Sequence, residues 1–334
     1  MNGDPGYSSP LALTMGEPVG VGPELTARVW HQRHEHPVPP FVFVGPLEAL
    51  AGLPSPPLTE IIDSPEQAIT VFDQALPVLP RGTLMPLHPG EPDPLNADAV
   101  LGSIETAAEL ALAGQVAGMV TNPIQKSSLR AAGFAYAGHT DFLATLCGLS
   151  PDQAVMMLAA DDFRVVPLSH HVALKEAISK VTKANIVDRA KTVLRALSDD
   201  FGIKSPRLAV AGLNPHAGED GAFGDEEITQ IKPAIVELNE SGADVSGPYS
   251  PDTLFTPAKR QSYDAVLCMY HDQALIPVKS SGFENAVNIT LGLPIVRTSP
   301  AHGTALALAG KGTAWPDSLR AALREAAALA AGKR

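Results

Sequence analysis

The sequence predicts a layered α/β/α protein, and two observations support this fold class. Short apolar runs alternate with helix-forming segments along most of the 334 residues, an arrangement typical of parallel sheets whose crossover connections are helices. Most of the apolar runs are continuous rather than alternately apolar and polar, which is expected where both faces of a sheet are covered. We expect strands over residues 11–15, 41–44, 118–121, 155–159, 163–168, 207–212, 264–269 and 294–297.

The first expected strand is followed by a glycine-rich turn and a helix over about residues 24–34, which is a common α/β opening. The glycines of this turn follow the pattern G-x-x-x-G-x-G, not the G-x-G-x-x-G fingerprint of dinucleotide-binding domains. The glycines therefore have two explanations: they allow a tight strand-to-helix turn, or they lie close to a cofactor or substrate.

Later segments continue the alternation. An alanine-rich run over about residues 97–115 predicts a helix that ends at Gly114. The range 77–96 is rich in proline and lacks periodicity, so we expect a surface loop or an irregular edge there. A last amphipathic helix is expected from Asp317, just after Pro316, to the end of the chain.

The composition is that of a compact globular protein with room for two hydrophobic cores. Hydrophobic residues make up 45% of the chain and charged residues only 18%, which argues against intrinsic disorder. The net charge is −12, and no run of lysine or arginine forms the basic surface that a nucleic-acid-binding protein needs. We therefore expect no nucleic-acid partner.

The N-terminal residues have neither the basic nor the apolar segment of a secretory signal, and no apolar run approaches the ~20 residues that cross a bilayer. We therefore expect a cytoplasmic protein without a membrane partner. Cys147 and Cys268 lie in apolar surroundings without a CxxC spacing, which favours reduced, buried thiols over a disulfide or a metal pair.

Three histidines stand in short polar or turn-forming runs: His171, His216 and His271. They are too far apart in the sequence for a zinc finger or ribbon, so only the tertiary fold can bring them together. Three protein ligands with a fourth position open are typical of a catalytic rather than a structural metal site. Taken singly, each is explained as well by a core or helix-capping role; taken together, they also fit a shared divalent-metal site.

Two segments are suited to an anionic ligand. Residues 121–126 follow a buried strand, and ligands collect at strand ends in open α/β sheets. Gly138, His139 and Thr140 precede an apolar helical segment. Thr140 is therefore a candidate helix cap, and the backbone N–H groups there suit a phosphate or carboxylate.

Lys279, Asn288 and Arg297 lie in a region of otherwise low charge. A lysine supplies a point charge and an arginine a fixed fork of donors, so the pair suits recognition of an anionic substrate. The alternative is that both cations are solvated at the surface.

These motifs, in this order, closely resemble the 4-hydroxythreonine-4-phosphate dehydrogenase family of vitamin B6 biosynthesis. The resemblance covers nearly the whole chain. It rests on Gly16-Glu17-Pro18, Thr121-Asn122-Pro123-Ile124, Gly138-His139-Thr140, Asn214-Pro215-His216-Ala217-Gly218-Glu219, Tyr270-His271-Asp272-Gln273 and His302-Gly303-Thr304-Ala305. The series is highly specific for the family and less specific for the substrate.

The family is similar in fold to isocitrate and isopropylmalate dehydrogenases, which implies two α/β domains with the active site in the cleft between them. The implied first domain, on the cofactor side, comprises residues 1–125 plus 285–334. The implied second domain, residues 126–284, carries the metal, substrate and dimer contacts. The resemblance also implies a homodimer whose active site is shared between the subunits.

The resemblance also implies residue roles. The metal ligands would be His171, His216 and His271, drawn from both subunits; His170 is the alternative to His171, which is favoured by the apolar run after it. The substrate would be bound by His139, Thr140, Lys279, Asn288 and Arg297, and the cofactor by His302, Gly303, Thr304 and Ala305. The implied cofactors are NAD or NADP and a divalent metal such as Zn²⁺, Mg²⁺ or Co²⁺.

The implied reaction is NAD(P)-dependent oxidation of 4-phosphooxy-L-threonine to 2-amino-3-oxo-4-phosphooxybutanoate, which decarboxylates to 3-amino-2-oxopropyl phosphate during pyridoxal phosphate biosynthesis. Candidate bases for the hydroxyl proton are Lys279, Asp252 and Asp272. Relatives acting on threonate or erythronate 4-phosphate, or on a cis-dihydrodiol carboxylate, are alternatives. A metallohydrolase is a remoter alternative, because no H-E-x-x-H element supplies its usual base. The last is a non-catalytic phosphate-binding protein.

Overall fold

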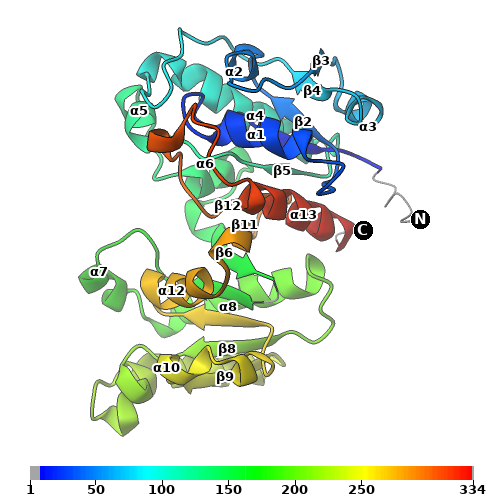
Figure 1. Cartoon of the computed structure of the whole chain (residues 1–334). Helices are drawn as coiled ribbons and strands as arrows, with labels where there is room; N and C mark the ends of the chain where they lie inside the picture. The colour runs from blue at the N-terminus through cyan, green and yellow to red at the C-terminus, as the bar shows by residue number, and fades with distance from the viewer. Residues whose placement is uncertain (1–7, 162, 333–334) are drawn as a thin grey trace. The chain divides into compact units, whose positions relative to one another are not determined.

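The computed structural model describes residues 8–161 and 163–332. The chain divides into two compact units, which are described separately below. The first contains the residues up to Ala154 together with Leu293–Ala331, and the second contains Val155–Gly292. Each unit combines its own strands with its own helices (Figure 1). The predicted α/β fold class is therefore confirmed.

The strands of the first unit are parallel throughout and have the order β3-β4-β2-β1-β5-β12. They are β1 (Leu11–Thr14), β2 (Phe41–Val44), β3 (Thr59–Ile61), β4 (Leu76–Leu79), β5 (Gly118–Val120) and β12 (Arg297–Pro300). Every residue of β1 and β2 is buried. This is the pattern of central strands that are covered on both faces.

The helices of the first unit are α1 (Gly22–His31), α2 (Glu48–Ala51), α3 (Ala68–Val71), α4 (Ala97–Leu112), α5 (Lys126–Ala131), α6 (His139–Leu146) and α13 (Asp317–Gly332), with the short turns η1 (Pro65–Gln67), η2 (Pro94–Asn96), η3 (Pro151–Gln153) and η7 (Leu306–Leu308). Helix α4 packs on β1, β2 and β5. Helix α13, red in Figure 1, is tied to β12 because the Thr298 hydroxyl donates to Ala322 O at 2.7 Å.

The glycine-rich turn after β1 approaches the end of β5 very closely. Gly16 has φ +72°, and a Cβ at this position would lie 2.6 Å from Cβ of Asn122. Both the left-handed backbone and the lack of space therefore require glycine. The Asn122 amide in turn donates to Thr14 O at 2.9 Å and to Thr26 Oγ1 at 3.0 Å. The ends of β1 and β5 and the start of α1 are thus fixed to one another.

The strands of the second unit have the order β11-β6-β7-β10-β8-β9. They are β6 (Val155–Ala160), β7 (Phe163–Pro167), β8 (Arg207–Ala211), β9 (Asp244–Tyr249), β10 (Ala265–Cys268) and β11 (Val287–Leu291). Strand β6 is antiparallel to both of its neighbours, whereas β7, β10, β8 and β9 are mutually parallel. The carboxyl ends of these four strands therefore lie at one edge of the sheet.

The helices of the second unit are α7 (Leu174–Ser179), α8 (Lys183–Asp199), α9 (Lys232–Glu240), α10 (Pro251–Leu254), α11 (Pro257–Arg260) and α12 (His271–Gly282), with the turns η4 (Pro215–Gly221), η5 (Glu227–Ile231) and η6 (Phe283–Asn285). Helix α12 packs on β6, β7 and β10, and α9 packs on β9 and α8. Across the described residues of both units, the helices are either too short or too polar to span a membrane.

Some expectations about individual elements were wrong. The range 77–96 was expected to lack regular structure, but its first residues belong to β4, where Leu76 and Val78 are fully buried. Pro77 misled the prediction: its fixed φ suits a strand, although it removes one ladder donor. The strand expected at 294–297 starts only at Arg297, and β3, β9 and β11 were not expected.

The boundaries of the two units differ from the expected positions 126 and 285. Helices α5 and α6 belong to the first unit, in which α6 contacts α4 and α5 contacts η2. The expected cap of α6 was also wrong, because the N-cap position is occupied by Gly138 and no side chain caps this helix. Both cysteines are free thiols, as expected, but only Cys268 is buried; Cys147 is half-buried.

Candidate functional site

The three histidines singled out in the sequence follow three neighbouring strands of the second unit. His171 lies after β7, His216 after β8 and His271 directly after β10, and the strand order places β10 between β7 and β8. Because these strands are parallel, all three histidines lie at the same edge of the sheet. Carboxyl ends of parallel strands are where α/β proteins bind their ligands.

The orientation of His271 is fixed by its neighbours. It is the first residue of α12, and its Nδ1 lies 2.7 Å from Oδ1 of Asp272. A carboxylate can only accept, so Nδ1 carries the proton in this contact, and in the neutral tautomer Nε2 would present its lone pair. The buried Gln273 side chain anchors this turn, since it accepts from Met269 N at 2.6 Å and donates to Gly212 O at 2.8 Å.

His171 lies close to His271. Their ring centroids are 6.0 Å apart, whereas the ring of His170 stacks edge-on against His171 at 5.2 Å. His171 has φ +53°, a left-handed conformation that is uncommon for residues other than glycine, although histidine, asparagine and aspartate adopt it more often than the rest. Such outliers cluster at functional sites.

His216 lies in an unusual backbone segment. Five consecutive residues of η4, from His216 to Asp220, have left-handed φ values between +40° and +80°. Each non-glycine residue in this conformation costs about 1–2 kcal/mol, so the surrounding structure must hold the turn in place. The Asp252 carboxylate lies near His216; its pKa is lowered, mainly by the Ser250 hydroxyl that donates to it at 2.6 Å and also by the charge of His216.

The three histidines do not form a complete metal site within one chain. Over residues 8–161 and 163–332, no group of three or more His, Cys, Asp or Glu side chains is close enough to hold a metal ion. His171 and His271 are neighbours, and His216 does not join them.

In the first unit, Arg297 forms the centre of a second group of predicted site residues. It is only 3% exposed, and two of its N–H groups donate to Oγ1 of Thr121, at 2.7 and 3.2 Å. Burial lowers the pKa of the Arg297 guanidinium to about 10. A cation that has lost its hydration in this way attracts an anionic ligand.

His139 lies close to this cation. Burial, together with the charges of Arg297 and Lys126, holds the pKa of the His139 imidazole well below its usual value of 6.5. The ring is therefore neutral, and its buried Nε2 has no hydrogen-bond partner among the residues that the structure describes. An unsatisfied buried nitrogen of this kind needs an explanation, and a bound ligand supplies one.

Lys126 and Thr140 complete this group, which we call the anion group: Thr121, Lys126, His139, Thr140 and Arg297. Nζ of Lys126 is so close to Gly138 that a Cβ there would lie 3.2 Å from it. Thr140 follows His139 in the first turn of α6, where backbone N–H groups lack partners within the helix. The group therefore combines two cations, a neutral imidazole and free donors.

The predicted cofactor loop also belongs to the first unit. His302 is half-buried, burial lowers its pKa, and its buried Nε2 has no hydrogen-bond partner within the described part of the chain. The loop packs on the glycine-rich turn: Thr304 O accepts from Val21 N at 3.0 Å, and a Cβ on Gly20 would lie 3.0 Å from the same oxygen. The Thr304 hydroxyl donates to Gln125 Oε1 at 3.1 Å.

The other two predicted substrate-binding residues belong to the second unit. Lys279 is half-buried on α12, about two helical turns after His271. Asn288 lies on β11 opposite Leu158 of β6, and its buried Oδ1 has no partner among the described residues. Three predicted substrate residues thus lie in the first unit, and two lie in the second.

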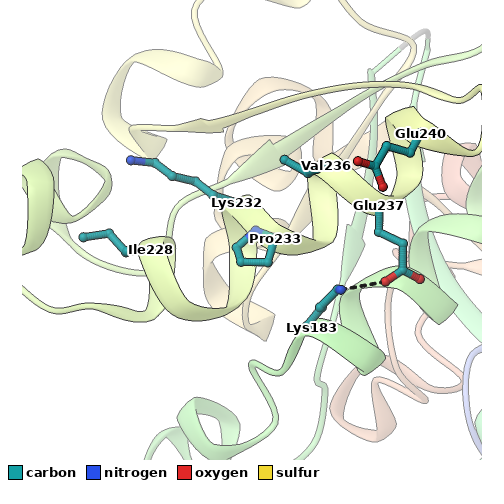
Figure 2. A pocket seen from close by; sticks show the side chains of 7 residues that line it. All are labelled: Lys183, Ile228, Lys232, Pro233, Val236, Glu237 and Glu240. Atoms are coloured by element: carbon teal, nitrogen blue, oxygen red, sulfur yellow. Dashed lines mark ion pairs between the residues drawn. The ribbon is translucent and has the colours of Figure 1, made fainter.

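A surface hollow of about 380 Å³ lies elsewhere in the second unit, between the start of α8 and the segment η5–α9 (Figure 2). It is lined by Lys183, Ile228, Lys232, Pro233, Val236, Glu237 and Glu240. Lys183 and Glu237 form an ion pair across it at 2.8 Å. None of the predicted site residues lines this hollow.

Comparison with known proteins decides the family. Residues 47–326 match the family model described as pyridoxal phosphate biosynthetic protein PdxA. The chain is 49% identical to 4-hydroxythreonine-4-phosphate dehydrogenase of Caulobacter vibrioides, over 97% of this chain and 98% of that protein. This chain belongs to the PdxA family.

Two solved structures show how far the similarity extends. The structure of 4-hydroxythreonine-4-phosphate dehydrogenase from Klebsiella pneumoniae matches with a TM-score of 0.85 and 36% identity, covering 97% of this chain and all of that one. A terephthalate 1,2-cis-dihydrodioldehydrogenase from Burkholderia xenovorans matches with a TM-score of 0.63 and 27% identity, covering 93% and 95%. The similarity is clearly greater to the former.

Several residues of the candidate site were not predicted from the sequence. Lys126 was quoted within the run 121–126 but was given no role, and Thr121 was not paired with Arg297. Glu227, a fully buried carboxylate beside the His216 loop, was not noticed at all. An acidic residue inside an otherwise amphipathic helical segment was the one available signal.

Proposed function

We propose that this chain catalyses the NAD(P)-dependent oxidation of 4-phosphooxy-L-threonine to 2-amino-3-oxo-4-phosphooxybutanoate, which decarboxylates to 3-amino-2-oxopropyl phosphate. The observation that carries the proposal is the match, over nearly the whole chain, to relatives named 4-hydroxythreonine-4-phosphate dehydrogenase. The chain is thus a dehydrogenase of pyridoxal phosphate biosynthesis. The two groups of site residues support the same reaction.

The anion group is suited to the phosphate and carboxylate of this substrate. Arg297 offers a planar fork of donors, and Lys126 offers a point charge beside Gly138. The neutral His139 can donate through Nε2 without adding charge. Asn288 of the second unit adds an amide to the proposed substrate contacts, and Lys279 adds an amine whose N–H groups can donate to the same anions.

The histidines fit a divalent metal in their donor chemistry. Neutral imidazoles suit Zn²⁺ and Co²⁺, and a metal-bound histidine usually donates its other N–H to a carboxylate, as His271 does to Asp272. We propose His171, rather than His170, as the second ligand because its ring is the one beside His271. His216 would be the third. A bound divalent ion would act as a Lewis acid, lowering the pKa of the substrate hydroxyl and polarising the ketone.

Lys279 is the base that we favour for the hydroxyl proton. Asp272 already accepts from His271, which is an orienting role. The lowered pKa of Asp252 makes its carboxylate a weaker base. Lys279 lies on the same helix as His271 and lines up with it after about two turns.

The loop His302–Ala305 fits a nicotinamide cofactor through the unsatisfied Nε2 of His302 and through its packing on the glycine-rich turn. Bound NAD or NADP would supply the hydride acceptor. The backbone here is closely packed, since Thr304 O contacts both Gly20 and Val21. The glycine-rich turn and the loop His302–Ala305 therefore pack directly against each other.

The protein is proposed to act as a homodimer with a shared site. Exposed apolar side chains follow each of the three histidines: Leu174 and Ile178, Phe223 and Ile228, and Ile276. Apolar side chains gathered around polar site residues are typical of an interface. A second subunit that covers them would also bring a partner histidine to an incomplete site.

Subunit complementation tests the shared site. His171 and His271 are neighbours in one chain, so both would serve one site while His216 serves the other. A heterodimer of His216→Ala and His271→Ala subunits then retains one complete site and about half of the wild-type turnover. A heterodimer of His171→Ala and His271→Ala has no complete site and is expected to be inactive. The reverse pattern would contradict this assignment of ligands.

The reaction itself is tested by absorbance at 340 nm with NAD or NADP, Co²⁺ and 4-phosphooxy-L-threonine. We expect nucleotide reduction that depends on both substrate and metal. The 27% identical dihydrodiol dehydrogenase supports a second candidate, a cis-dihydrodiol carboxylate. Threonate 4-phosphate and terephthalate cis-dihydrodiol are therefore assayed in parallel, and turnover with one of these alone would replace the proposed substrate.

A further inference from the structure

Glu227 is a carboxylate with no exposed surface, and it lies against the loop that carries His216. It is the first residue of η5, a π-helical turn that precedes α9. Buried carboxylates are rare unless their oxygens accept several hydrogen bonds. The oxygens of Glu227 therefore require hydrogen-bond donors, and residues of the loop that carries His216 provide them.

Three donors of this loop converge on Glu227. Oε1 accepts from Leu213 N at 2.8 Å and from Asn214 N at 2.7 Å, and Oε2 accepts from Nδ2 of Asn214 at 2.9 Å. The neighbouring Glu226 accepts from the same Nδ2 at 2.7 Å. The chain immediately before His216 is thus held by a charge-assisted network.

Two glycines allow the carboxylate to come this close. A Cβ on Gly218 would lie 2.7 Å from Oε2 of Glu227, and a Cβ on Gly212 would lie 3.1 Å from Oε1. Both glycines flank His216 in the sequence, one before it and one after it. Gly218 of the left-handed turn and Gly212 before it therefore both lie against the carboxylate of Glu227.

We propose that Glu227 is the positioning residue for His216: it fixes the backbone of residues 213–214, so that the strained turn presents the His216 imidazole before any metal binds. The inference rests on the proposed function, in which His216 is a metal ligand. In this role Glu227 would contact neither the metal nor the substrate. Its effect on catalysis would pass through the position of one imidazole.

The substitution Glu227→Gln is the sharpest change. The glutamine Oε1 can still accept from both backbone N–H groups, but its Nε2 places a donor against the Nδ2 donor of Asn214. We expect the Kd for Co²⁺ to rise about 10- to 100-fold. It is measured by adding Co²⁺ to the metal-free protein and following the visible d–d absorption of the bound ion. A Kd within about 2-fold of wild type would overturn the proposal.

Two matched variants make this result specific. Glu237→Gln makes the same change on α9, where Glu237 pairs with Lys183 and not with the loop, and is expected to leave the Kd for Co²⁺ unchanged. Asn214→Ala removes the side-chain donor but leaves both backbone N–H groups on Glu227, so its effect should lie between those of the two glutamine variants. An equal loss in Glu237→Gln would mean that charge, not position, matters.

His216→Ala separates this proposal from the proposed function. If His216→Ala binds Co²⁺ as tightly as wild type, the ligand assignment fails, and the positioning role fails with it. If His216→Ala loses affinity while Glu227→Gln does not, only the positioning role fails.

Amide hydrogen exchange of the unmodified protein gives a test that needs no variant to fold. In the metal-free protein, the amides of Leu213 and Asn214 should be as protected as they are with Co²⁺ bound, because Glu227 already accepts from both. Protection that appears only after metal addition would show that the metal, rather than Glu227, orders the loop, and would overturn the proposal.

Discussion

The anion group of the first unit and the three histidines of the second unit are prepared in opposite ways. In the anion group, Arg297 is buried, is held by Thr121 and lies near His139, all within one chain. His171 and His216 are exposed and have left-handed backbone conformations, and the half-buried His271 is the first residue of α12. Tertiary contacts within one chain assemble the anion group, whereas among the described residues the three histidines do not come together.

The difference shows which part of the site folding alone can build. Two cations and a neutral imidazole are compatible with one another once their desolvation is offset by the rest of the fold. Three imidazoles that could share a metal ion do not stabilise one another by lying close together unless the ion is bound. Gln273 and Glu227 accordingly hold the backbone beside His271 and His216, while the His216 ring does not join the neighbouring rings of His171 and His271 within the described residues.

The largest effect is expected from His271→Ala. Loss of one of three proposed metal ligands should lower kcat by about 10³-fold or more, measured by nucleotide reduction at 340 nm. Asp272→Asn keeps the imidazole but weakens its orientation, and should cost only about 10- to 100-fold. Turnover that survives in His271→Ala would show that His271 is not needed for the reaction. The contrast between the anion group and the three histidines would then not concern catalysis.

Arg297→Lys should produce the next largest effect. Lysine keeps the charge but loses the planar fork and one of the bonds to Thr121. We expect KM for the phosphorylated substrate to rise about 10- to 100-fold, because charged hydrogen bonds are worth about 1.5–3 kcal/mol. The Kd for Co²⁺ should not change. Arg130→Lys, at an exposed position on α5, is the matched control, and an equal rise in KM there would contradict a specific role for Arg297.

The smallest effect concerns the stability of the fold below neutral pH. Because the pKa of His139 is depressed in the folded chain, the unfolded chain binds more protons as the pH falls through about 6.5, and stability is lost on acidification. His139→Gln removes this loss, by at most about 1.4 kcal/mol per pH unit. Urea unfolding between about pH 7.5 and pH 5.5 measures it, with exposed His36→Gln as control. Parallel pH curves for His139→Gln and wild type would show that the imidazole is not desolvated.

The sequence was a good guide where a local pattern carries the information. Continuous apolar runs located β1, β2, β5, β8 and β10, and turn-forming residues located the three histidines at strand ends. It was a poor guide where contacts are made between distant segments. The pairing of Thr121 with Arg297, the approach of Lys126 to Gly138 and the burial of Glu227 all depend on tertiary packing. Pro77 and the polar Asn288 concealed β4 and β11 because both residues are atypical of strands.

The left-handed turn of residues 216–220 also constrains how this chain can vary. At Ala217, Glu219 and Asp220 the tolerated amino acids are set by backbone handedness rather than by polarity or size. Glycine, asparagine and aspartate should be readily exchanged there, whereas valine, isoleucine and threonine should be excluded even though each position is at least partly exposed. In a homologue with β-branched residues at these positions, we expect a different backbone conformation. Such a homologue would then not use a histidine at position 216 in the same way.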